Sequence, residues 1–247
     1  MSVNFTKSLL INEEPYAYCP GCSHGIVHRL LAETVDELAI KERCVGVSSI
    51  GCSVRCWKFI DLDFVQGAHG RGLAVATGIK RAQPDKIVFT YQGDGDLIAI
   101  GMGETVHAAA RGENVTVIFV NNTVFGATGG QLAPTTLIGQ KTVTYPEGRD
   151  EQVIGKPIRM AELLATLDTT KYVARVSLDS PANIRQAKNA MKKSFRMQLE
   201  NKGFSFVEFL AACPSNLKLT PVDAMKWIKD KMIAYYPLGE FKKLEGI

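Results

Sequence analysis

The sequence predicts an α/β fold in which helices cover both faces of a doubly wound, mostly parallel β-sheet. Two observations predict it. Short apolar runs alternate along the chain with longer segments whose apolar residues recur at helical spacing. Polar, glycine-rich motifs follow several apolar runs, as they do where a parallel strand ends and a helix begins. The sequence shows no repeat, coiled coil or linker, so we expect a single domain over residues 1–247.

The expected elements follow this alternation in chain order. Residues 1–18 form an irregular lead-in, and the expected strands span residues 44–48, 87–91, 115–120, 171–178 and 204–211. A first helix is expected from Ser23, its candidate N-cap, and later helices over residues 67–82, 100–111, 159–167, 181–201 and 221–232. Ser180-Pro181 and Thr220-Pro221 mark the last two starts, because each places a capping residue before a proline at the first helical position.

Two segments of this pattern need a special explanation. Residues 67–82 are rich in glycine and alanine, and glycine in a helix costs up to ~1 kcal/mol relative to alanine. We therefore expect close packing or a bound ligand there. Residues 123–157 have poor periodicity and many Gly, Pro and Thr residues. Loops of this length are usually functional, so the segment is expected to be a lid or an interface.

Composition excludes several classes of protein. Of the 247 residues, 46% are hydrophobic and 22% are charged, as in ordinary globular proteins. The net charge of +4 is spread along the chain, which argues against a nucleic-acid-binding surface. No apolar run approaches the roughly 20 residues that cross a bilayer, and the N-terminus lacks a signal-peptide pattern. We expect a cytoplasmic protein without a membrane or nucleic-acid partner.

Two polar motifs follow neighbouring strands of the predicted sheet. Gly93-Asp94-Gly95 comes after one apolar run, and Asn121-Asn122 ends the next, with a helical segment between them. Both motifs should lie at the carboxyl edge of the sheet. Asp94 and Asn122 offer oxygen ligands that suit a magnesium ion bound to a diphosphate, and the flanking glycines would let the backbone turn sharply beside a phosphate. The Gly-Asp-Gly triplet alone is equally typical of an ordinary turn.

The spacing of the two motifs is more specific than either motif. Gly-Asp-Gly followed some twenty-five residues later by Asn-Asn resembles the fingerprint of thiamine-diphosphate enzymes. The resemblance implies a magnesium ion held by Asp94, Asn122 and the backbone carbonyl of Val124. It also implies a diphosphate-binding (PP-type) domain.

Six cysteines form the second group of candidate ligands, and disulfides are uncommon in reducing cytosol. The Cys19-x-x-Cys22 pair fits zinc, an iron–sulfur cluster or a redox pair, although a redox pair would follow a strand. Cys52 and Cys213 lie past expected strand ends, so both can meet the pair at one sheet edge. Cys44 opens an apolar strand and is expected to be buried, whereas the role of Cys56 stays undecided.

Together these motifs resemble, in order and over most of the chain, the β subunit of 2-oxoacid:ferredoxin oxidoreductases. The matching segments are Cys19-Pro20-Gly21-Cys22-Ser23-His24-Gly25, Ile50-Gly51-Cys52-Ser53, the thiamine motif, Thr128-Gly129-Gly130-Gln131 and Cys213-Pro214. Ser23 stands where this family usually has glycine. The resemblance implies a [4Fe-4S] cluster on Cys19, Cys22, Cys52 and Cys213. It also implies cofactor contacts from Gly51, Cys52, Ser53, His69, Gly93, Asp94, Gly95, Asp96, Asn122, Val124, Gly126 and Thr128.

The resemblance also implies an activity and partners. The family decarboxylates a 2-oxoacid oxidatively, transfers the acyl group to coenzyme A and passes electrons to ferredoxin. In thiamine enzymes the activating glutamate comes from a different domain than the diphosphate-binding one, and this chain contains only the diphosphate-binding half. We therefore expect an α subunit that completes the thiamine site, with γ and δ subunits as further candidates.

Two side chains are candidates for catalytic contacts. His69 is expected at a helix start, where it either binds the diphosphate or caps the helix, and the family has a histidine here. His28 and His107 lie in expected helices and are interpreted as structural or surface residues. Arg55 either pairs with a substrate carboxylate, which would favour 2-oxoglutarate, or is solvated. Branched 2-oxoacids such as 2-oxoisovalerate fit the family equally.

Two other functions remain open from the sequence. A non-oxidative thiamine enzyme explains Asp94 and Asn122 but gives the cysteines no role. A non-catalytic electron-transfer module explains the cysteines but leaves the thiamine motif without a role. Iron and thiamine assays would separate all three.

Overall fold

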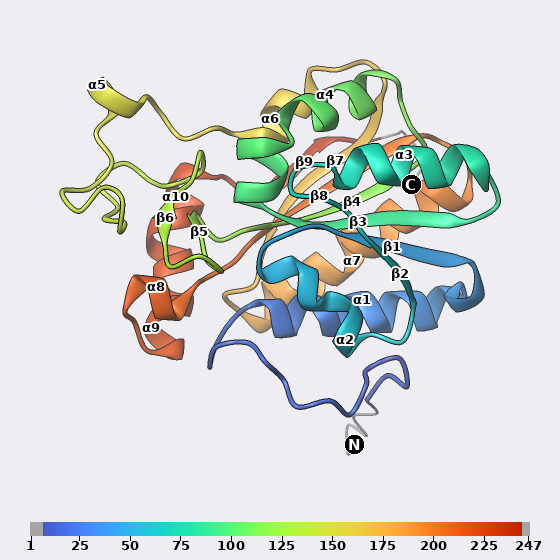
Figure 1. Cartoon of the computed structure of the whole chain (residues 1–247), viewed down its shortest axis with the longest axis horizontal. Coiled ribbons are helices and arrows are strands. Elements are labelled where there is room, and N and C mark those ends of the chain that lie inside the picture. Colours follow the sequence, from blue (N-terminus) through green and yellow to red (C-terminus); the bar gives the residue numbers. More distant parts are fainter. Residues whose placement is uncertain (1–6, 244–247) are drawn as a thin grey trace.

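The computed structural model describes residues 7–243 and is built on a seven-stranded sheet between two layers of helices (Figure 1). The strand order is β2-β1-β3-β4-β8-β7-β9. The strands are β1 Cys44–Ser48, β2 Asp63–Gln66, β3 Ile87–Gly93, β4 Thr116–Asn121, β7 Thr170–Ser177, β8 Phe204–Leu210 and β9 Gly239–Lys242. All neighbours in this sheet pair in parallel except β7 and β9. The predicted α/β class with a mostly parallel sheet is confirmed.

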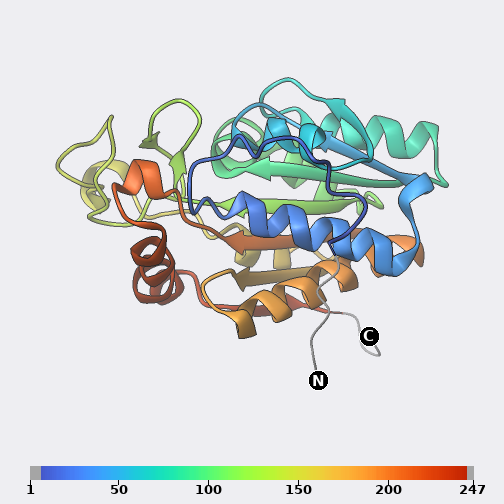
Figure 2. The same ribbon diagram turned by 90° about the horizontal axis from the view of Figure 1, so that it is seen from below.

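Each face of the sheet has its own apolar core. One face packs against α1 His24–Leu38 and α7 Pro181–Leu199, which lie side by side across it (Figure 2). The other face packs against α3 Gly72–Ala82, α4 Met102–Ala110 and α6 Met160–Ala165. The central strands are buried on both faces, as expected of apolar runs in a parallel sheet. In the described residues, no helix combines the length and apolarity needed to cross a membrane.

A smaller group of short elements lies beyond the carboxyl ends of the strands. It contains the antiparallel pair β5 Val124–Phe125 and β6 Gln131–Leu132, and the helices α5 Glu151–Ile154, α8 Pro214–Leu217, α9 Pro221–Trp227 and α10 Ile233–Tyr235. A π-helical turn, Ile228–Met232, joins α9 to α10. After β1, the 3₁₀ turn Cys52–Arg55 leads into α2 Cys56–Phe59, and a second 3₁₀ turn, Lys41–Arg43, precedes β1.

The long loop predicted over residues 123–157 is irregular but well packed. Arg149 is buried, and its guanidinium donates hydrogen bonds to the carbonyl oxygens of Ala133, Thr136 and Gly155. Tyr236 Oη donates to the carbonyl oxygen of Thr135 from the C-terminal segment. One cation therefore satisfies carbonyls that no regular element pairs, which gives the loop a defined shape.

Several sequence-based expectations about boundaries are wrong. The helix expected over residues 67–82 begins at Gly72, because residues 67–71 form a loop in which Gly70 has a left-handed φ of +79°. A Cβ on Gly70 would lie 2.5 Å from Ile100, so the glycine permits a close approach to the turn before α4. The edge strands β2 and β9 were not expected, since each is short and largely exposed and lacks an apolar run.

The three predicted caps have different outcomes. Ser180 Oγ accepts a hydrogen bond from the Asn183 amide, and Thr220 Oγ1 accepts one from Asp223, so both caps are confirmed. Ser23 does not cap the first helix. Its backbone is already helical, and its hydroxyl accepts from the amide of Ala212 at 3.0 Å. Ser23 instead fastens the start of α1 to the end of β8.

A buried charge network ties β7 to β8. The Arg175 side chain is fully buried, and its guanidinium binds Glu208 at 2.8 Å and Glu162 at 2.5 Å. Glu208 is itself 1% exposed and accepts a second hydrogen bond from Asn121 Nδ2 at the end of β4. Burial raises the pKa of Glu208, while Arg175 opposes that shift.

Replacing Arg175 should destabilise the fold strongly. Arg175→Met leaves Glu208 buried without its cation, and breaking such a pair typically costs about 3–5 kcal/mol in the free energy of unfolding. Denaturant unfolding of the purified chain measures this cost. The exposed residue Arg185 on α7 supplies the control, because Arg185→Met should stay within about 0.5 kcal/mol of the wild type. Equal effects of the two substitutions would contradict the assignment.

Candidate functional site

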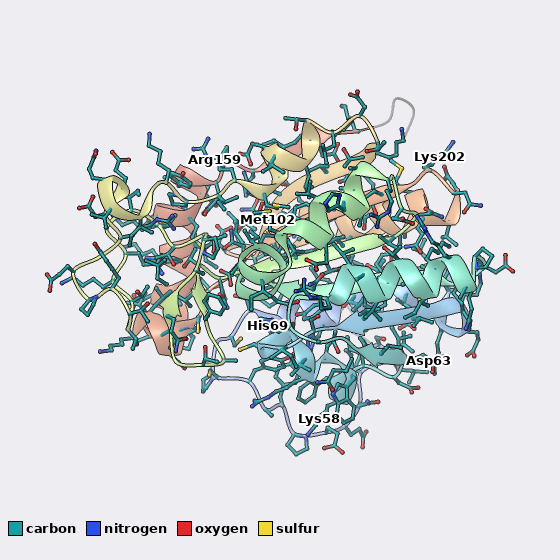
Figure 3. All side chains as sticks on the ribbon, turned by 45° about the horizontal axis from the view of Figure 1, so that its top comes forward. Lys58, Asp63, His69, Met102, Arg159 and Lys202 are labelled. Atoms are coloured by element: carbon teal, nitrogen blue, oxygen red, sulfur yellow. The ribbon has the colours of Figure 1, made fainter. Side chains whose placement is uncertain are left out.

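The carboxyl ends of the central strands open onto one cavity of about 480 Å³. Figure 3 shows His69 at this end of the sheet, whereas Asp63 and Lys202, which begin or precede strands, lie toward the opposite end. The cavity is lined by every site residue predicted from the sequence: Cys19, Cys22, Gly51, Cys52, Ser53, Arg55, His69, Gly93, Asp94, Gly95, Asp96, Asn122, Val124, Gly126, Thr128 and Cys213. The fold therefore brings both predicted ligand groups together, and their roles remain predictions.

Asp94 is a buried carboxylate without a cationic partner among the described residues. It lies directly after β3, where the π-helical turn Gly95–Ile100 begins, and it is 2% exposed. Its Oδ1 accepts from the Gly95 amide, and its Oδ2 accepts from Thr135 Oγ1 at 2.6 Å. Burial raises the pKa of Asp94 to about 7, against these hydrogen bonds. A hard cation beside Asp94 would remove the cost of burying its charge, so the site fits a magnesium ion.

Asn122 follows β4 on the neighbouring strand and is 8% exposed. Its Oδ1 accepts weakly from the Val124 amide at 3.3 Å, which leaves acceptor capacity on this oxygen. The donor set at this edge is a carboxylate, an amide oxygen and the main chain around Val124. These are oxygen ligands of the kind that magnesium prefers.

The sharp turn predicted at the glycines of the Gly-Asp-Gly motif is wrong, whereas a close approach of this backbone to a phosphate stays a prediction. Neither Gly93 nor Gly95 has a positive φ, so the chain does not turn there through a conformation that requires glycine. A Cβ on Gly95 would instead lie 2.3 Å from Cε1 of Phe125. Gly95 is therefore needed because the Phe125 ring packs directly on this turn.

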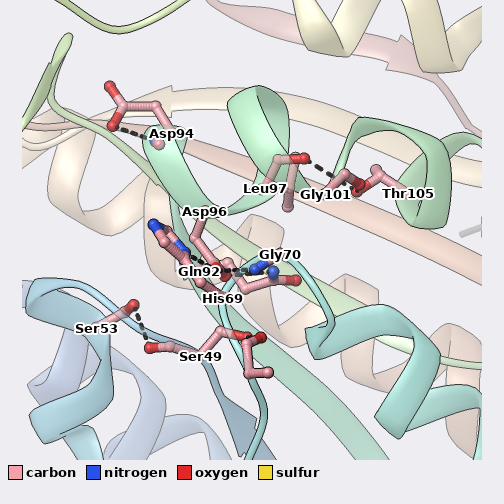
Figure 4. A network of polar contacts seen from close by, with 12 residues as sticks. Ser49, Ser53, His69, Gly70, Gln92, Asp94, Asp96, Leu97, Gly101 and Thr105 are labelled. Carbon is pink, nitrogen blue, oxygen red and sulfur yellow. Dashed lines mark hydrogen bonds and ion pairs between the residues drawn. The ribbon is translucent and has the colours of Figure 1, made fainter.

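His69 is held by Asp96 rather than by a helix end (Figure 4). His69 Nδ1 donates to Asp96 Oδ1 at 2.7 Å, and the Gly70 amide donates to the same oxygen. Gln92 Nε2 donates to Asp96 Oδ2. The capping interpretation of His69 fails, because α3 begins three residues later. With Nδ1 engaged, the Nε2 atom of this partly exposed ring is left to meet a ligand.

The four predicted cluster cysteines border the same cavity. Cys52 Sγ and Cys213 Sγ lie 3.5 and 3.7 Å from the position of a Cβ on Gly126, so both thiols flank that glycine. Burial raises the pKa of Cys22 to about 12, and the other three thiols add to this shift. Among the described residues, no three His, Cys, Asp or Glu side chains are placed to hold one metal ion. The donor set nevertheless fits a four-thiolate cluster, whose cysteines bind separate iron atoms.

The two remaining cysteines are structural. Cys44 and Cys56 are buried in the core beneath α1, and Cys56 is fully buried. Burial raises the pKa of both thiols, as expected of inert core cysteines.

Two predicted site residues make local contacts. Arg55 is exposed at the cavity edge, and its Nη1 donates to the carbonyl oxygen of Ala17 at 2.8 Å. Thr128 Oγ1 donates to Gln131 Oε1 at 2.6 Å within the glycine-rich segment. Neither side chain is committed to the interior of the cavity.

An aromatic wall beside the cysteines was missed from the sequence. Tyr18 stacks on His24 with ring centroids 4.9 Å apart and donates its hydroxyl to the Cys52 carbonyl. His24 Nδ1 is hydrogen-bonded to the Tyr91 hydroxyl at 2.6 Å. Burial lowers the pKa of His24 to about 4, so the ring is neutral near pH 7. The one available signal was that Tyr18 and His24 flank the Cys19–Cys22 motif.

Comparison with known proteins decides the family. Residues 49–209 match the family described as thiamine pyrophosphate enzyme, C-terminal TPP binding domain. The 2-oxoglutarate synthase subunit KorB of Methanocaldococcus jannaschii is 37% identical over 89% of this chain and 79% of that protein. This chain belongs to the 2-oxoacid:ferredoxin oxidoreductase subunits that carry a thiamine pyrophosphate enzyme domain.

Further relatives of this oxidoreductase family agree. The ketoisovalerate oxidoreductase subunit VorA of Methanothermobacter thermautotrophicus is 49% identical over 91% of this chain but only 47% of that protein. The chain thus spans about half the length of that relative. The 2-oxoglutarate:ferredoxin oxidoreductase from Magnetococcus marinus, solved with 2-oxoglutarate, coenzyme A and succinyl-CoA, has a TM-score of 0.81 and 26% identity. That match covers 99% of this chain and 87% of the solved one.

Buried histidines on α1 should make the stability of the fold pH-dependent. His28 is 1% exposed, and burial holds its pKa well below the usual range. In the unfolded chain His28 takes up a proton below about pH 6.5, whereas in the folded chain it stays neutral. The free energy of unfolding therefore decreases as the pH falls, by about 1.4 kcal/mol per pH unit for one proton. The substitution His28→Leu should remove this one-proton contribution to the slope of the free energy of unfolding against pH, measured between pH 6 and 5.

Denaturant unfolding at several pH values measures that slope. His107 lies exposed on α4, so His107→Leu is the matched control and should keep the wild-type slope. A slope that His28→Leu leaves unchanged would show that His28 is protonated in the folded chain.

Proposed function

We propose that this chain is the thiamine-diphosphate-binding catalytic subunit of a 2-oxoacid:ferredoxin oxidoreductase. The reaction converts a 2-oxoacid and coenzyme A into an acyl-CoA and carbon dioxide, with electrons leaving through a [4Fe-4S] cluster to ferredoxin. One observation carries the proposal: the oxygen ligands at Asp94 and Asn122 and the four thiols open onto the same cavity. A non-oxidative thiamine enzyme would leave the thiols without a role, and an electron-transfer module would leave Asp94 buried without a counterion.

In this proposal the chain acts as a single thiamine-diphosphate-binding domain. Asp94, Asn122 and the carbonyl of Val124 hold the magnesium ion and, through it, the diphosphate. His69 Nε2 contacts the diphosphate, and the hydrogen bond from His69 Nδ1 to Asp96 fixes which nitrogen is presented. Thiamine diphosphate, when bound, supplies the electron sink for decarboxylation.

The protein's own side chains keep this part of the site dry and rigid. Thr135 reaches Asp94 from the long loop, and the Phe125 ring covers Gly95. Because both contacts come from residues 123–157, the predicted lid is part of the cofactor site in this proposal. The remaining predicted contacts, at Gly51, Ser53, Gly126 and Thr128, line the cavity around it.

The second cofactor in the proposal is the iron–sulfur cluster, held by Cys19, Cys22, Cys52 and Cys213. A cluster held by these cysteines would supply one-electron transfer between the thiamine site and ferredoxin. The stacked rings of Tyr18 and His24 line the cavity beside these thiols, and His24 is buried. Reduction potentials of such clusters depend on how far their surroundings exclude solvent.

The proposed enzyme works only as an assembly in the cytoplasm. The glutamate that activates the aminopyrimidine of thiamine comes from an α subunit, and γ and δ subunits are further candidates for the complex. The length of VorA, about twice the matched region, supports a role for additional polypeptide beyond this domain. Coenzyme A, the 2-oxoacid and ferredoxin complete the list of partners.

Sequence similarity supports a branched-chain substrate. Identity to the ketoisovalerate oxidoreductase subunit is 49%, whereas identity to the 2-oxoglutarate synthase subunit is 37%. We therefore propose a branched-chain 2-oxoacid as the main substrate and 2-oxoglutarate as the alternative. Arg55 at the cavity edge is the residue that would serve a second carboxylate.

The cysteine assignment is tested with a matched pair of substitutions. Anaerobically purified protein, isolated with its partner subunits, should show visible iron–sulfur absorption and contain iron and thiamine. Cys52→Ser should lose the absorption and the iron because one ligand is missing, whereas Cys44→Ala in the core should keep both. Visible spectra with iron and thiamine assays measure this. Wild-type protein without iron would overturn the proposed oxidoreductase.

Substrate preference tests Arg55. In the assembled enzyme, Arg55→Ala should lower kcat/KM for 2-oxoglutarate by about tenfold, since it removes a charge-assisted contact to the distal carboxylate. The value for 2-oxoisovalerate, which has no second carboxylate, should stay within about twofold. Steady-state assays with both acids and a ferredoxin acceptor give the comparison. An unchanged ratio removes Arg55 from substrate recognition.

A further inference from the structure

Asn216 connects the two halves of the cavity. It lies on α8, three residues after Cys213, and its Nδ2 donates to Cys213 Sγ at 3.2 Å and to the Gly126 carbonyl oxygen at 3.1 Å. An amide nitrogen carries two hydrogens, so both bonds can form together. Gly126 belongs to the segment that also contains Asn122 and Val124. One side chain therefore joins a candidate cluster thiol to the segment proposed to bind magnesium.

The surroundings hold Asn216 in this orientation. A Cβ on Gly130, whose φ is +92°, would lie only 2.8 Å from Asn216 Oδ1, so the glycine-rich segment packs directly on the amide. Of the four cluster candidates, Cys213 alone has a side-chain N–H donor within the described part of the chain.

We propose that Asn216 is a positioning residue that holds the Cys213 thiolate against the segment 122–126 and raises the reduction potential of the cluster. The inference rests on the proposed function, in which Cys213 is a cluster ligand. Reduction adds one electron, and part of the added negative charge falls on the ligating sulfurs. An N–H donor at one of these sulfurs stabilises the reduced form more than the oxidised form.

The position of the hydrogen bond from Asn216 to Cys213 indicates its effect on electron transfer. The hydrogen bond acts on one of the two thiols that flank Gly126, and Gly126 also lies beside Asn122 of the proposed thiamine site. A higher potential there favours the transfer of each electron from the thiamine side to the cluster. Asn216 would thus set how readily the cluster is reduced without touching the substrate.

A redox titration of the assembled enzyme tests the inference. Asn216→Leu keeps a similar volume but removes both donors from the side chain. With dithionite as the electron donor, we expect reduction of the cluster to become about tenfold less favourable, which for one electron is a shift of about 59 mV to lower potential. Electron paramagnetic resonance of the reduced cluster reports the midpoint, in samples matched for iron content. Asn216→Gln retains an N–H donor and should recover part of the shift.

Controls separate this role from a structural one. Asn189 is exposed on α7 and lines a different cavity, so Asn189→Leu should keep the wild-type midpoint. If Asn216→Leu does not load a cluster, Asn216→Ala provides the same loss of the donor without added bulk, and the same shift is expected. A wild-type midpoint in a loaded Asn216 variant overturns the role of Asn216 alone. Absence of any cluster from the wild-type enzyme overturns the proposed function and this inference with it.

Discussion

The parallel register of four central strands is the constraint on which the site depends. Ser48 of β1 is paired with Tyr91 of β3, and Gly93 of β3 with Val120 of β4. Asn121 of β4 is in turn paired with Leu210 of β8. These pairings end the strands at nearly the same level, so the segments that follow them meet at one edge. Ligand groups from distant parts of the sequence meet there because every strand in this set runs the same way.

Burial at that edge has an energetic cost that the structure offsets with specific partners. Asp96 accepts hydrogen bonds from Gln92, His69 and Gly70, whereas Asp94 accepts them from the Gly95 amide and Thr135 and has no histidine, lysine or arginine partner among the described residues. The contrast separates a carboxylate that organises the site from one that is ready for a ligand. At the last residue of β4, Asn121 binds Glu208, which connects the site to the charge network around Arg175.

Support for the cysteines comes from the N-terminal segment, the start of α1 and the short helix α8. Tyr18 holds the carbonyl of Cys52, Ser23 binds the amide of Ala212 beside Cys213, and Asn216 binds the thiol of Cys213. Each contact joins the N-terminal segment or α8 to a strand end. The spacing of the thiols therefore depends on several loops at once, in keeping with a site that sits between the sheet and the short elements beyond it (Figure 1).

The five central strands and the main helices could be predicted from the sequence because apolar periodicity is a local pattern. The residues at the cavity were predicted from the order and spacing of the motifs and from the family that these motifs resemble. The sequence did not predict β2 and β9, which pair at the sheet edges without apolar runs of their own. The folded structure was needed to show that Gly95 makes room for Phe125, that Ser23 accepts from the Ala212 amide and that Asp96 holds His69. Those assignments are contacts between residues far apart in the chain, and no local pattern encodes which distant atom a short polar side chain or a missing Cβ will meet.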